Sequence, residues 1–292
     1  MLSYQHEYHA GNFADVHKHL CLRVLFESLL KKEKPFCYVD CHAGAGIHDL
    51  ASAQAQTTAE FAGGIGKLWR RFEATDLHSL SAYLAGVASL NNSGVLRHYP
   101  GSPELARQWL RPQDRALLLE LHPQAQQALK KNFRSDTRIS VHNRDCYEGL
   151  VALVPPPIRR GLVLLDPSYE LKNEYRDLVA LVVAAHKRWG NAIYAIWYPL
   201  LPAARHNELV KALANSGLHN ILLSELLVKE IDESGGMYGS GMAIVNPPWQ
   251  TDSALQTLLP VVANLLAPGR GAAQLRWLVQ DGVANPTAKN PG

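Results

Sequence analysis

Short apolar runs alternate with longer segments of helical periodicity along most of the chain. The apolar runs favour strands near residues 36–40, 116–121, 138–142, 161–165, 191–197, 220–228 and 241–245. Several of these runs are apolar throughout, as expected where helices cover both faces of a sheet. The pattern therefore predicts an α/β fold with a mostly parallel, seven-stranded sheet.

Apolar positions three and four residues apart predict helices between these runs. The first helix spans residues 14–34, ahead of the first strand. Ser102 and Pro103 form a favourable helix start, because a hydroxyl at the N-cap precedes proline at the first helical position. The remaining helices are predicted at residues 103–111, 123–134, 172–189, 204–215 and 252–266.

Residues 47–100 interrupt this alternation. They are rich in Ala, Gln, Ser and Leu and contain helical stretches near residues 67–73 and 79–90. We interpret residues 47–100 as an inserted helical subdomain, so that residues 1–46 and 101–292 form the main domain. The Pro, Gly, Lys and Asn residues after Asn285 predict a frayed tail.

The composition narrows the class of protein. Hydrophobic residues make up 47% and charged residues 19% of the 292 positions, which is typical of a globular protein with a sizeable core. No apolar run approaches the roughly 18 residues that span a bilayer, and the N-terminus lacks the features of a signal peptide. The four cysteines have no disulfide-like spacing, which favours reduced thiols and a cytoplasmic location. The net charge of +3 permits an anionic partner without requiring one.

The end of the first predicted strand carries a glycine-rich loop, residues 41–46 (CHAGAG). Gly44 and Gly46 allow positive φ and a close approach of the backbone to a ligand, and exposed N–H groups there can hold a carboxylate. A nicotinamide dinucleotide would need a third glycine at position 49, where the chain has Asp49. S-adenosyl-L-methionine fits this loop better, and a plain strand-to-helix turn is the alternative.

Acids end two further strands. Glu120 follows an apolar run, at the position where an acid accepts hydrogen bonds from ribose hydroxyls. Asp145 follows residues 139–143 and is suited to accept a hydrogen bond from the adenine amino group of the cofactor. Either acid alone is more often a solvated strand end, but their recurrence after successive strands favours a cofactor site.

Residues 164–169 (LLDPSY) stand at the end of another predicted strand and include residues suited to catalysis. The amino group of adenine is a poor nucleophile, because its lone pair is delocalised into the ring. Asp166 and the carbonyl of Pro167 can accept hydrogen bonds from both N–H groups, and Tyr169 can stack on an extruded base. Positioning and charge then supply most of the catalysis. The pattern predicts methyl transfer to the amino group of a nucleobase.

A second motif, residues 246–249 (NPPW), matches the Asn/Asp-Pro-Pro-aromatic pattern more closely. However, the order of the strands favours Asp166. The strand before it follows the strands that end in acids suited to bind the cofactor, as expected of the fourth strand of the sheet. We therefore assign residues 246–249 to a structural turn after the seventh strand.

The chain resembles the RlmJ family of bacterial adenine-N(6) methyltransferases that act on 23S ribosomal RNA. The resemblance covers nearly the whole chain, in residues 2–6 (LSYQH), 9–12 (HAGN), 15–19 (DVHKH), 42–46 (HAGAG), 99–103 (YPGSP), 120–123 (ELHP), 195–199 (AIWYP) and 239–242 (GSGM). It implies a Rossmann-like class I methyltransferase fold with a small helical insertion and S-adenosyl-L-methionine as the cofactor.

The resemblance also implies roles for individual residues. Catalysis is expected from Asp166, an RNA contact from Tyr4, and cofactor contacts from His19, His42, Ser102, Glu120, Asp145 and Cys146. The family usually has glycine at position 146 and a second proline at position 168, where this chain has Cys146 and Ser168. Because Asp166, the Pro167 carbonyl and Tyr169 are retained, we expect the chain to be active.

The expected partner is 23S rRNA, with no obligate protein partner and no membrane. RNA contacts should be electrostatic, and Lys18 is a candidate for one. No metal site is predicted, because His17 and His19 are two residues apart on a helix and therefore face different directions. Two alternatives remain open: a DNA adenine methyltransferase with the same site chemistry, and a non-catalytic RNA-binding relative whose site has decayed at Ser168.

Overall fold

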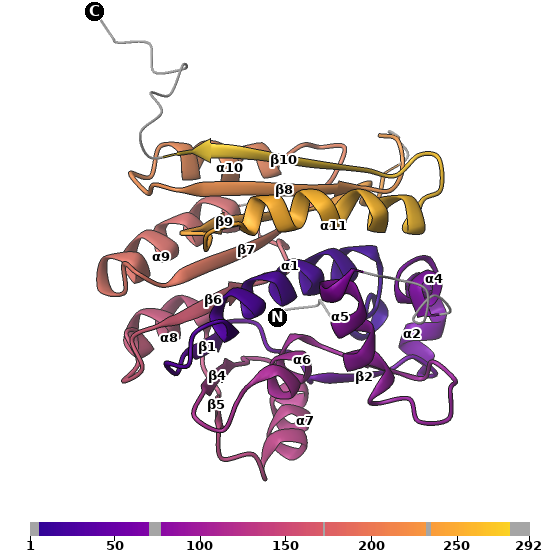
Figure 1. Cartoon of the computed structure of the whole chain (residues 1–292), viewed down its shortest axis with the longest axis horizontal. Coiled ribbons are helices and arrows are strands. Elements are labelled where there is room, and N and C mark those ends of the chain that lie inside the picture. Colours follow the sequence, from indigo (N-terminus) through magenta and orange to yellow (C-terminus); the bar gives the residue numbers. More distant parts are fainter. Residues whose placement is uncertain (1–5, 70–76, 172, 232–234, 281–292) are drawn as a thin grey trace, which may run out of the picture.

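The computed structural model describes residues 6–69, 77–171, 173–231 and 235–280 (Figure 1). Its strands are β1 (Cys37–Asp40), β2 (Ile47–Asp49), β3 (His98–Pro100), β4 (Arg115–Leu119), β5 (Ile139–His142), β6 (Gly161–Leu165), β7 (Ile193–Leu200), β8 (Ile221–Leu227), β9 (Gly239–Val245) and β10 (Ala272–Val279). A 3₁₀ helix η1 (His6–Tyr8) precedes the α-helices, which are α1 (Phe13–Leu30), α2 (Ala53–Thr58), α3 (Glu60–Gly63), α4 (Ile65–Trp69), α5 (His78–Ala88), α6 (Ser102–Trp109), α7 (Pro123–Phe133), α8 (Cys146–Leu153), α9 (Glu174–Arg188), α10 (His206–Ala214) and α11 (Thr251–Leu266). The frayed tail predicted after Asn285 lies outside the described residues.

The central sheet has the strand order β10-β8-β9-β7-β6-β1-β4-β5. Strands β7, β6, β1, β4 and β5 run parallel, whereas β9 is antiparallel to β7 and β8, and β10 is antiparallel to β8. The α/β fold with a mostly parallel sheet is therefore confirmed.

The prediction of seven strands was wrong, because β10 adds an eighth strand to the sheet among the described residues. Strand β10 is an edge strand whose burial alternates, and the polar Gln274 and Arg276 break its apolar run. A search for continuous apolar runs finds strands covered on both faces and misses such an edge strand. Helix α8, which is short, was also missed.

Helices cover both faces of the sheet, and successive strand residues point to opposite faces. In β6, Leu162 and Leu164 join the core beneath α1, α6 and α11, while Val163 and Leu165 join the core beneath α8, α9 and α10. This alternation follows from the period of two in a strand. It explains why β6 is apolar at every position.

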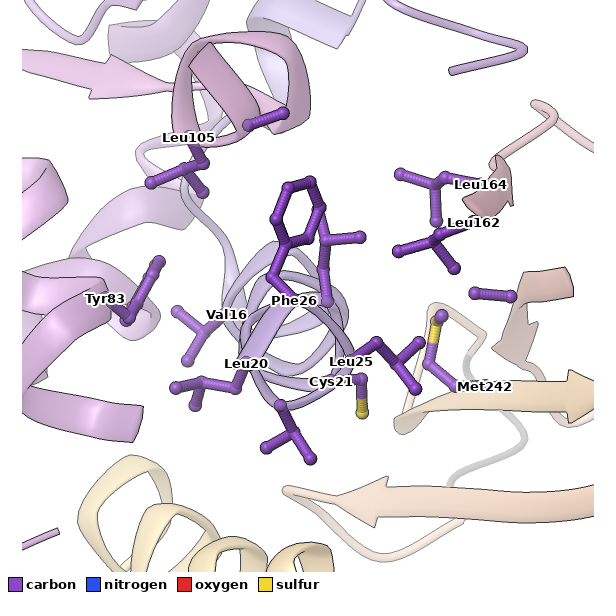
Figure 2. Packing of buried hydrophobic residues seen from close by; sticks show 14 of the residues in the cluster. Val16, Leu20, Cys21, Leu25, Phe26, Tyr83, Leu105, Leu162, Leu164 and Met242 are labelled. Atoms are coloured by element: carbon purple, nitrogen blue, oxygen red, sulfur yellow. The ribbon is translucent and has the colours of Figure 1, made fainter. Parts of the chain in front are cut away.

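Helix α1 is buried around most of its circumference and packs against β9, α5 and α11. Figure 2 shows its side chains, including Leu20, Leu25 and Phe26, pointing outward in several directions into the core. Asn12 caps the helix by accepting hydrogen bonds from the backbone N–H groups of residues 14 and 15. A helix enclosed in this way buries its polar residues too, so that each of them needs a partner.

Residues 47–100 contain α2, α3, α4 and α5, together with the antiparallel pair β2–β3, so they are not purely helical. Helix α5 lies against α1 (Figure 1). The division of the chain into a main domain and an inserted subdomain stays a prediction. Within the described ranges, no helix is both long enough and apolar enough to cross a membrane.

Candidate active site

The site lies where the strand order reverses. Strands β4 and β5 lie on one side of β1, and β6 and β7 lie on the other, so the chain crosses over between β5 and β6. Such a switch point leaves a crevice at the carboxyl ends of the strands. A cavity of about 290 Å³ occupies this place, and its walls are formed mainly by the residues that follow β1, β4, β5 and β6.

Most of the residues predicted for the site line this one cavity. They are Lys18, His19, His42, Gly44, Ser102, Glu120, Asp145, Cys146 and Asp166. Gly46, Pro167 and Tyr169 do not line it, and Tyr4 lies outside the described residues. The structure thus brings together side chains that are up to about 150 positions apart in the sequence.

The glycine loop is held against the end of β4. The N–H of Gly44 donates to Oε2 of Glu120 at 2.7 Å, and the N–H of His122 donates to Oε1 at 2.7 Å. Each carboxylate oxygen therefore keeps a lone pair for a ligand. Gly44 has a φ of +61°, and no atom lies within 4 Å of the position a Cβ would take there, so the backbone is open to the cavity.

Gly46 has a different role from Gly44. Its φ is +81°, and a Cβ at this position would lie 2.5 Å from the Phe133 ring. Its carbonyl accepts the N–H of Gly101 at 2.9 Å. Gly46 therefore shapes the turn and its packing, and it is not part of the cavity wall.

Asp40 orients the side chain of Ser102. The Asp40 carboxylate is fully buried and accepts the hydroxyls of Tyr38 and Ser102, both at 2.7 Å. Burial raises the pKa of the Asp40 carboxyl, and the hydrogen bonds from the two hydroxyls oppose this. Asp40 thus ties the end of β1 to the start of α6 and does not line the cavity itself.

Asp166 is paired with a buried lysine. The Lys18 side chain is 5% exposed, and its Nζ donates to Asp166 and, at 2.7 Å, to Oδ1 of Asp15. Burial opposes the charge on Lys18, but the two carboxylates outweigh it and raise the Lys18 pKa well above its ordinary value. Asp15 also accepts the N–H of Gly11 at 2.8 Å and contacts Nε2 of His6 at 3.1 Å.

This pairing corrects the role predicted for Lys18. The sequence made Lys18 a candidate for an electrostatic contact with RNA, whereas the ammonium group is enclosed and paired with Asp15 and Asp166. A charge neutralised by two carboxylates attracts a phosphate only weakly. Lys18 therefore belongs to the wall of the cavity and not to a surface patch.

Two histidines connect the walls of the cavity. Nδ1 of His42 accepts the backbone N–H of Asp166 at 3.1 Å, which ties the glycine loop to the end of β6. Nδ1 of His19 pairs with the Tyr99 hydroxyl at 2.7 Å, and Tyr99 pairs with Tyr83 at 3.0 Å. Burial, with a further contribution from Lys18, lowers the pKa of His19 well below its ordinary value. His19 is therefore a neutral ring with its Nε2 left for a ligand.

Four buried polar atoms that belong to residues lining the cavity make no hydrogen bond within the described protein. They are His19 Nε2, His48 Nδ1, Tyr147 OH and Glu174 Oε2, and all four residues line the cavity. An unpaired buried polar group costs about 1–3 kcal/mol, so the cavity is suited to a ligand with several polar groups. The sequence did not single out His48, Tyr147 or Glu174, because none of them stands in a motif.

Tyr169 lies just outside the cavity. It has a φ of +55°, its hydroxyl donates to the carbonyl of Trp197 at 2.6 Å, and its ring stacks on Tyr175 at 4.3 Å. Tyr175 thus covers one face of the ring. The stacking of Tyr169 on a substrate base stays a prediction.

The Asn-Pro-Pro-Trp motif forms a corner away from the cavity. Asn246 Nδ2 donates to the carbonyls of Gly190 and Ala192, both at 2.9 Å, and Trp249 is 86% exposed. Because β9 is antiparallel to β7, the end of β9 lies beside the start of β7. No residue of the motif lines the cavity, as expected of a structural turn.

The described residues contain no group of three or more His, Cys, Asp and Glu side chains arranged to hold a metal ion.

Comparison with known proteins gives a consistent result. A family model described as Ribosomal RNA large subunit methyltransferase D, RlmJ, matches residues 33–279. Ribosomal RNA large subunit methyltransferase J of Escherichia coli (strain K12) is 42% identical over 283 residues, covering 96% of this chain and 100% of that protein. Its namesake from Haemophilus influenzae (strain ATCC 51907 / DSM 11121 / KW20 / Rd) is 40% identical over 284 residues, with the same coverage. A crystal structure from Legionella pneumophila str. Philadelphia 1 matches with a TM-score of 0.85 at 32% identity, covering 92% of this chain and 98% of that one.

Proposed function

Because the chain belongs to the RlmJ family of ribosomal RNA large subunit methyltransferases, we propose that it methylates the 6-amino group of an adenine in 23S rRNA, with S-adenosyl-L-methionine as the methyl donor. The α/β fold is that of a class I methyltransferase. The observation that carries the proposal is that the Asp166 carboxylate lies in the wall of the same cavity as Gly44 and Glu120.

The polar groups of the cavity fit the cofactor. Glu120 offers carboxylate lone pairs to two ribose hydroxyls, and Asp145 offers an acceptor to the adenine amino group. The unpartnered Nε2 of His19 and the open backbone at Gly44 suit the carboxylate of the methionine part. When bound, S-adenosyl-L-methionine supplies an electrophilic methyl group on a positively charged sulfur.

The catalytic task of the protein is to present the amine. Asp166 accepts a hydrogen bond from one N–H of the target base, and the Pro167 carbonyl accepts from the other. Asp166 is held from two sides, by the ion pair of its carboxylate with Lys18 and by the hydrogen bond from its backbone N–H to His42. This reduces the reorganisation needed during methyl transfer. Tyr169 packs against the flipped base with the ring face that Tyr175 leaves uncovered.

The family supports the proposed substrate, and the free cysteine thiols support the proposed location. The relatives are named for the large ribosomal subunit, which supports 23S rRNA as the substrate. We propose that no obligate protein partner is needed, since the residues assigned to both tasks come from one chain. The four free cysteines support action in a reducing cytoplasm.

The decisive experiment compares substrates and variants side by side. Purified protein with radiolabelled S-adenosyl-L-methionine is expected to label deproteinised 23S rRNA and not duplex DNA, and mapping should place 6-methyladenine at a single site. Asp166→Ala, which removes the acceptor, is expected to abolish labelling while calorimetry shows cofactor binding largely intact. Glu120→Ala should instead weaken cofactor binding. Labelling of DNA would favour the DNA methyltransferase, and cofactor binding without turnover on any RNA would favour a decayed site.

A further inference from the structure

His48 lies outside the row of strand ends that forms most of the cavity wall. It belongs to β2, two positions after the glycine loop, and it is 5% exposed. The residue lines the cavity, but its Nδ1 atom makes no hydrogen bond within the described ranges. An unpaired buried nitrogen is unfavourable. The methyl transfer proposed above gives His48 no task, so a group of the bound ligand is the natural partner of this nitrogen.

Neighbouring groups hold the His48 ring in one position. The ring of His6 packs edge-on against it, with 5.1 Å between the centroids. On the other side, Nε2 of His48 lies 3.4 Å from the position a Cβ would take on Gly101, so the backbone of Gly101 passes close to the ring. Burial lowers the pKa of His48 to about 3, which keeps the ring neutral near neutral pH. A neutral imidazole has one N–H group, and at Nδ1 that group can donate a hydrogen bond to a ligand.

Tyr99 connects His48 with His19, the other histidine that has an unpaired nitrogen in this wall. In the antiparallel pair β2–β3, His48 lies directly opposite Tyr99, so the two side chains share one face of the pair. The Tyr99 hydroxyl pairs with Nδ1 of His19 at 2.7 Å, and the two rings lie 5.6 Å apart. Nε2 of His19 is buried and unpaired among the residues that the structure describes. Two neutral rings, one from α1 and one from β2, therefore present unpaired nitrogens to the same ligand.

The position of these rings decides which part of the ligand they meet. Glu120 and Asp145, which follow β4 and β5, are the acceptors proposed for the adenosine part. Imidazole N–H groups instead suit an anion, and the α-carboxylate of the methionine part is the one negative group of the cofactor. We propose that His48, together with His19, binds this carboxylate, so that residues 47–100 complete the cofactor site. The proposal rests on the proposed function in that S-adenosyl-L-methionine is the ligand of the cavity.

The test measures binding to the full-length protein by calorimetry with three ligands. S-adenosyl-L-methionine and S-adenosyl-L-homocysteine carry the α-carboxylate, whereas 5′-methylthioadenosine has the same adenosine part without it. His48→Leu removes the N–H donor and should weaken the binding of the first two ligands about tenfold. The affinity for 5′-methylthioadenosine should stay unchanged, which shows that the cavity of the variant is intact. His48→Asn places an amide N–H near the position of Nδ1 and should restore most of the lost affinity.

His98→Leu is the matched control. His98 precedes Tyr99 on β3, so it points to the opposite face of the β2–β3 pair, and it does not line the cavity. This variant should bind all three ligands like the wild type. The inference is overturned if His48→Leu binds S-adenosyl-L-homocysteine as tightly as the wild type, if it loses 5′-methylthioadenosine to the same extent, or if His48→Asn binds as weakly as His48→Leu. Calorimetry needs no RNA, so a protein that binds the cofactor but methylates no RNA would count against the proposed function alone.

Discussion

The ammonium group of Lys18 lies between the carboxylates of Asp15 and Asp166 and donates a hydrogen bond to each of them. All three side chains are at most 15% exposed. Removing the cation from such a group leaves two buried negative charges that repel each other. The stability of this corner of the fold and the geometry of the carboxylate proposed for catalysis therefore depend on the same residue.

Lys18→Met is expected to lower the free energy of unfolding by about 3–5 kcal/mol, the usual cost of breaking a buried ion pair from one side. Urea denaturation measures this change. The double variant Lys18→Met with Asp15→Asn should recover part of the loss, because only one unpaired carboxylate remains. A Lys18→Met protein as stable as the wild type would show that the pair does not persist in solution.

The two glycines of the loop after β1 should respond differently to replacement by alanine. Gly46→Ala combines a positive φ with a Cβ 2.5 Å from the Phe133 ring, and it should cost about 1–3 kcal/mol of stability. Gly44→Ala carries only the φ strain, about 1 kcal/mol, but places a methyl group where the proposed function has the cofactor approach. Denaturation should rank Gly46→Ala as the less stable protein, and calorimetry should rank Gly44→Ala as the weaker cofactor binder. The reverse ranking would contradict the separate roles of the two glycines.

The fold was predictable where strands are covered on both faces, because their apolar runs are continuous. The edge strand β10 escaped, since Gln274 and Arg276 interrupt its apolar pattern. Site residues were predictable when they end a strand or stand in a motif, as Glu120 and Asp166 do. Lys18 was assigned to the RNA because its sequence neighbours do not reveal that α1 is enclosed by other elements. Such burial is a property of the packed chain and has no local signature.

The buried His17 should make the protein sensitive to acid. Its Nδ1 pairs with Ser240 and its Nε2 with Ser224, both at 3.0 Å, and burial lowers its pKa from 6.5 to about 3. Between these values the unfolded chain binds a proton that the folded chain does not, so stability is lost as the pH falls below 6.5. This one group accounts for up to about 2 kcal/mol between its unfolded pKa and about pH 5.

Replacing His17 with Gln tests this account. His17→Gln should be less stable than the wild type near neutral pH, and the difference should shrink on acidification. Chemical denaturation at about pH 7 and about pH 5 measures both proteins. His78→Gln, which replaces a side chain that is 81% exposed, is the control and should follow the wild type at both values. A constant difference between His17→Gln and the wild type would exclude His17 as the source of acid sensitivity.

Tyr169 connects the segment after β6 to the core, and the roles of its ring and its hydroxyl can be separated by mutation. Tyr169→Phe loses the hydrogen bond to the Trp197 carbonyl, worth about 1 kcal/mol of stability, but keeps the aromatic face. We expect this variant to retain its turnover number. Tyr169→Leu keeps an apolar side chain without a stacking face, and its turnover number should fall sharply, while calorimetry shows unchanged cofactor affinity.

The comparison with Tyr175→Leu separates stacking on the base from simple packing. That variant removes the internal stacking partner of Tyr169 and leaves its ring available, so it should lose stability more than turnover. If both leucine variants lose turnover in proportion to their stability, Tyr169 is a packing residue and the base is held by other groups. If only Tyr169→Leu loses turnover, the aromatic face of Tyr169 acts on the substrate.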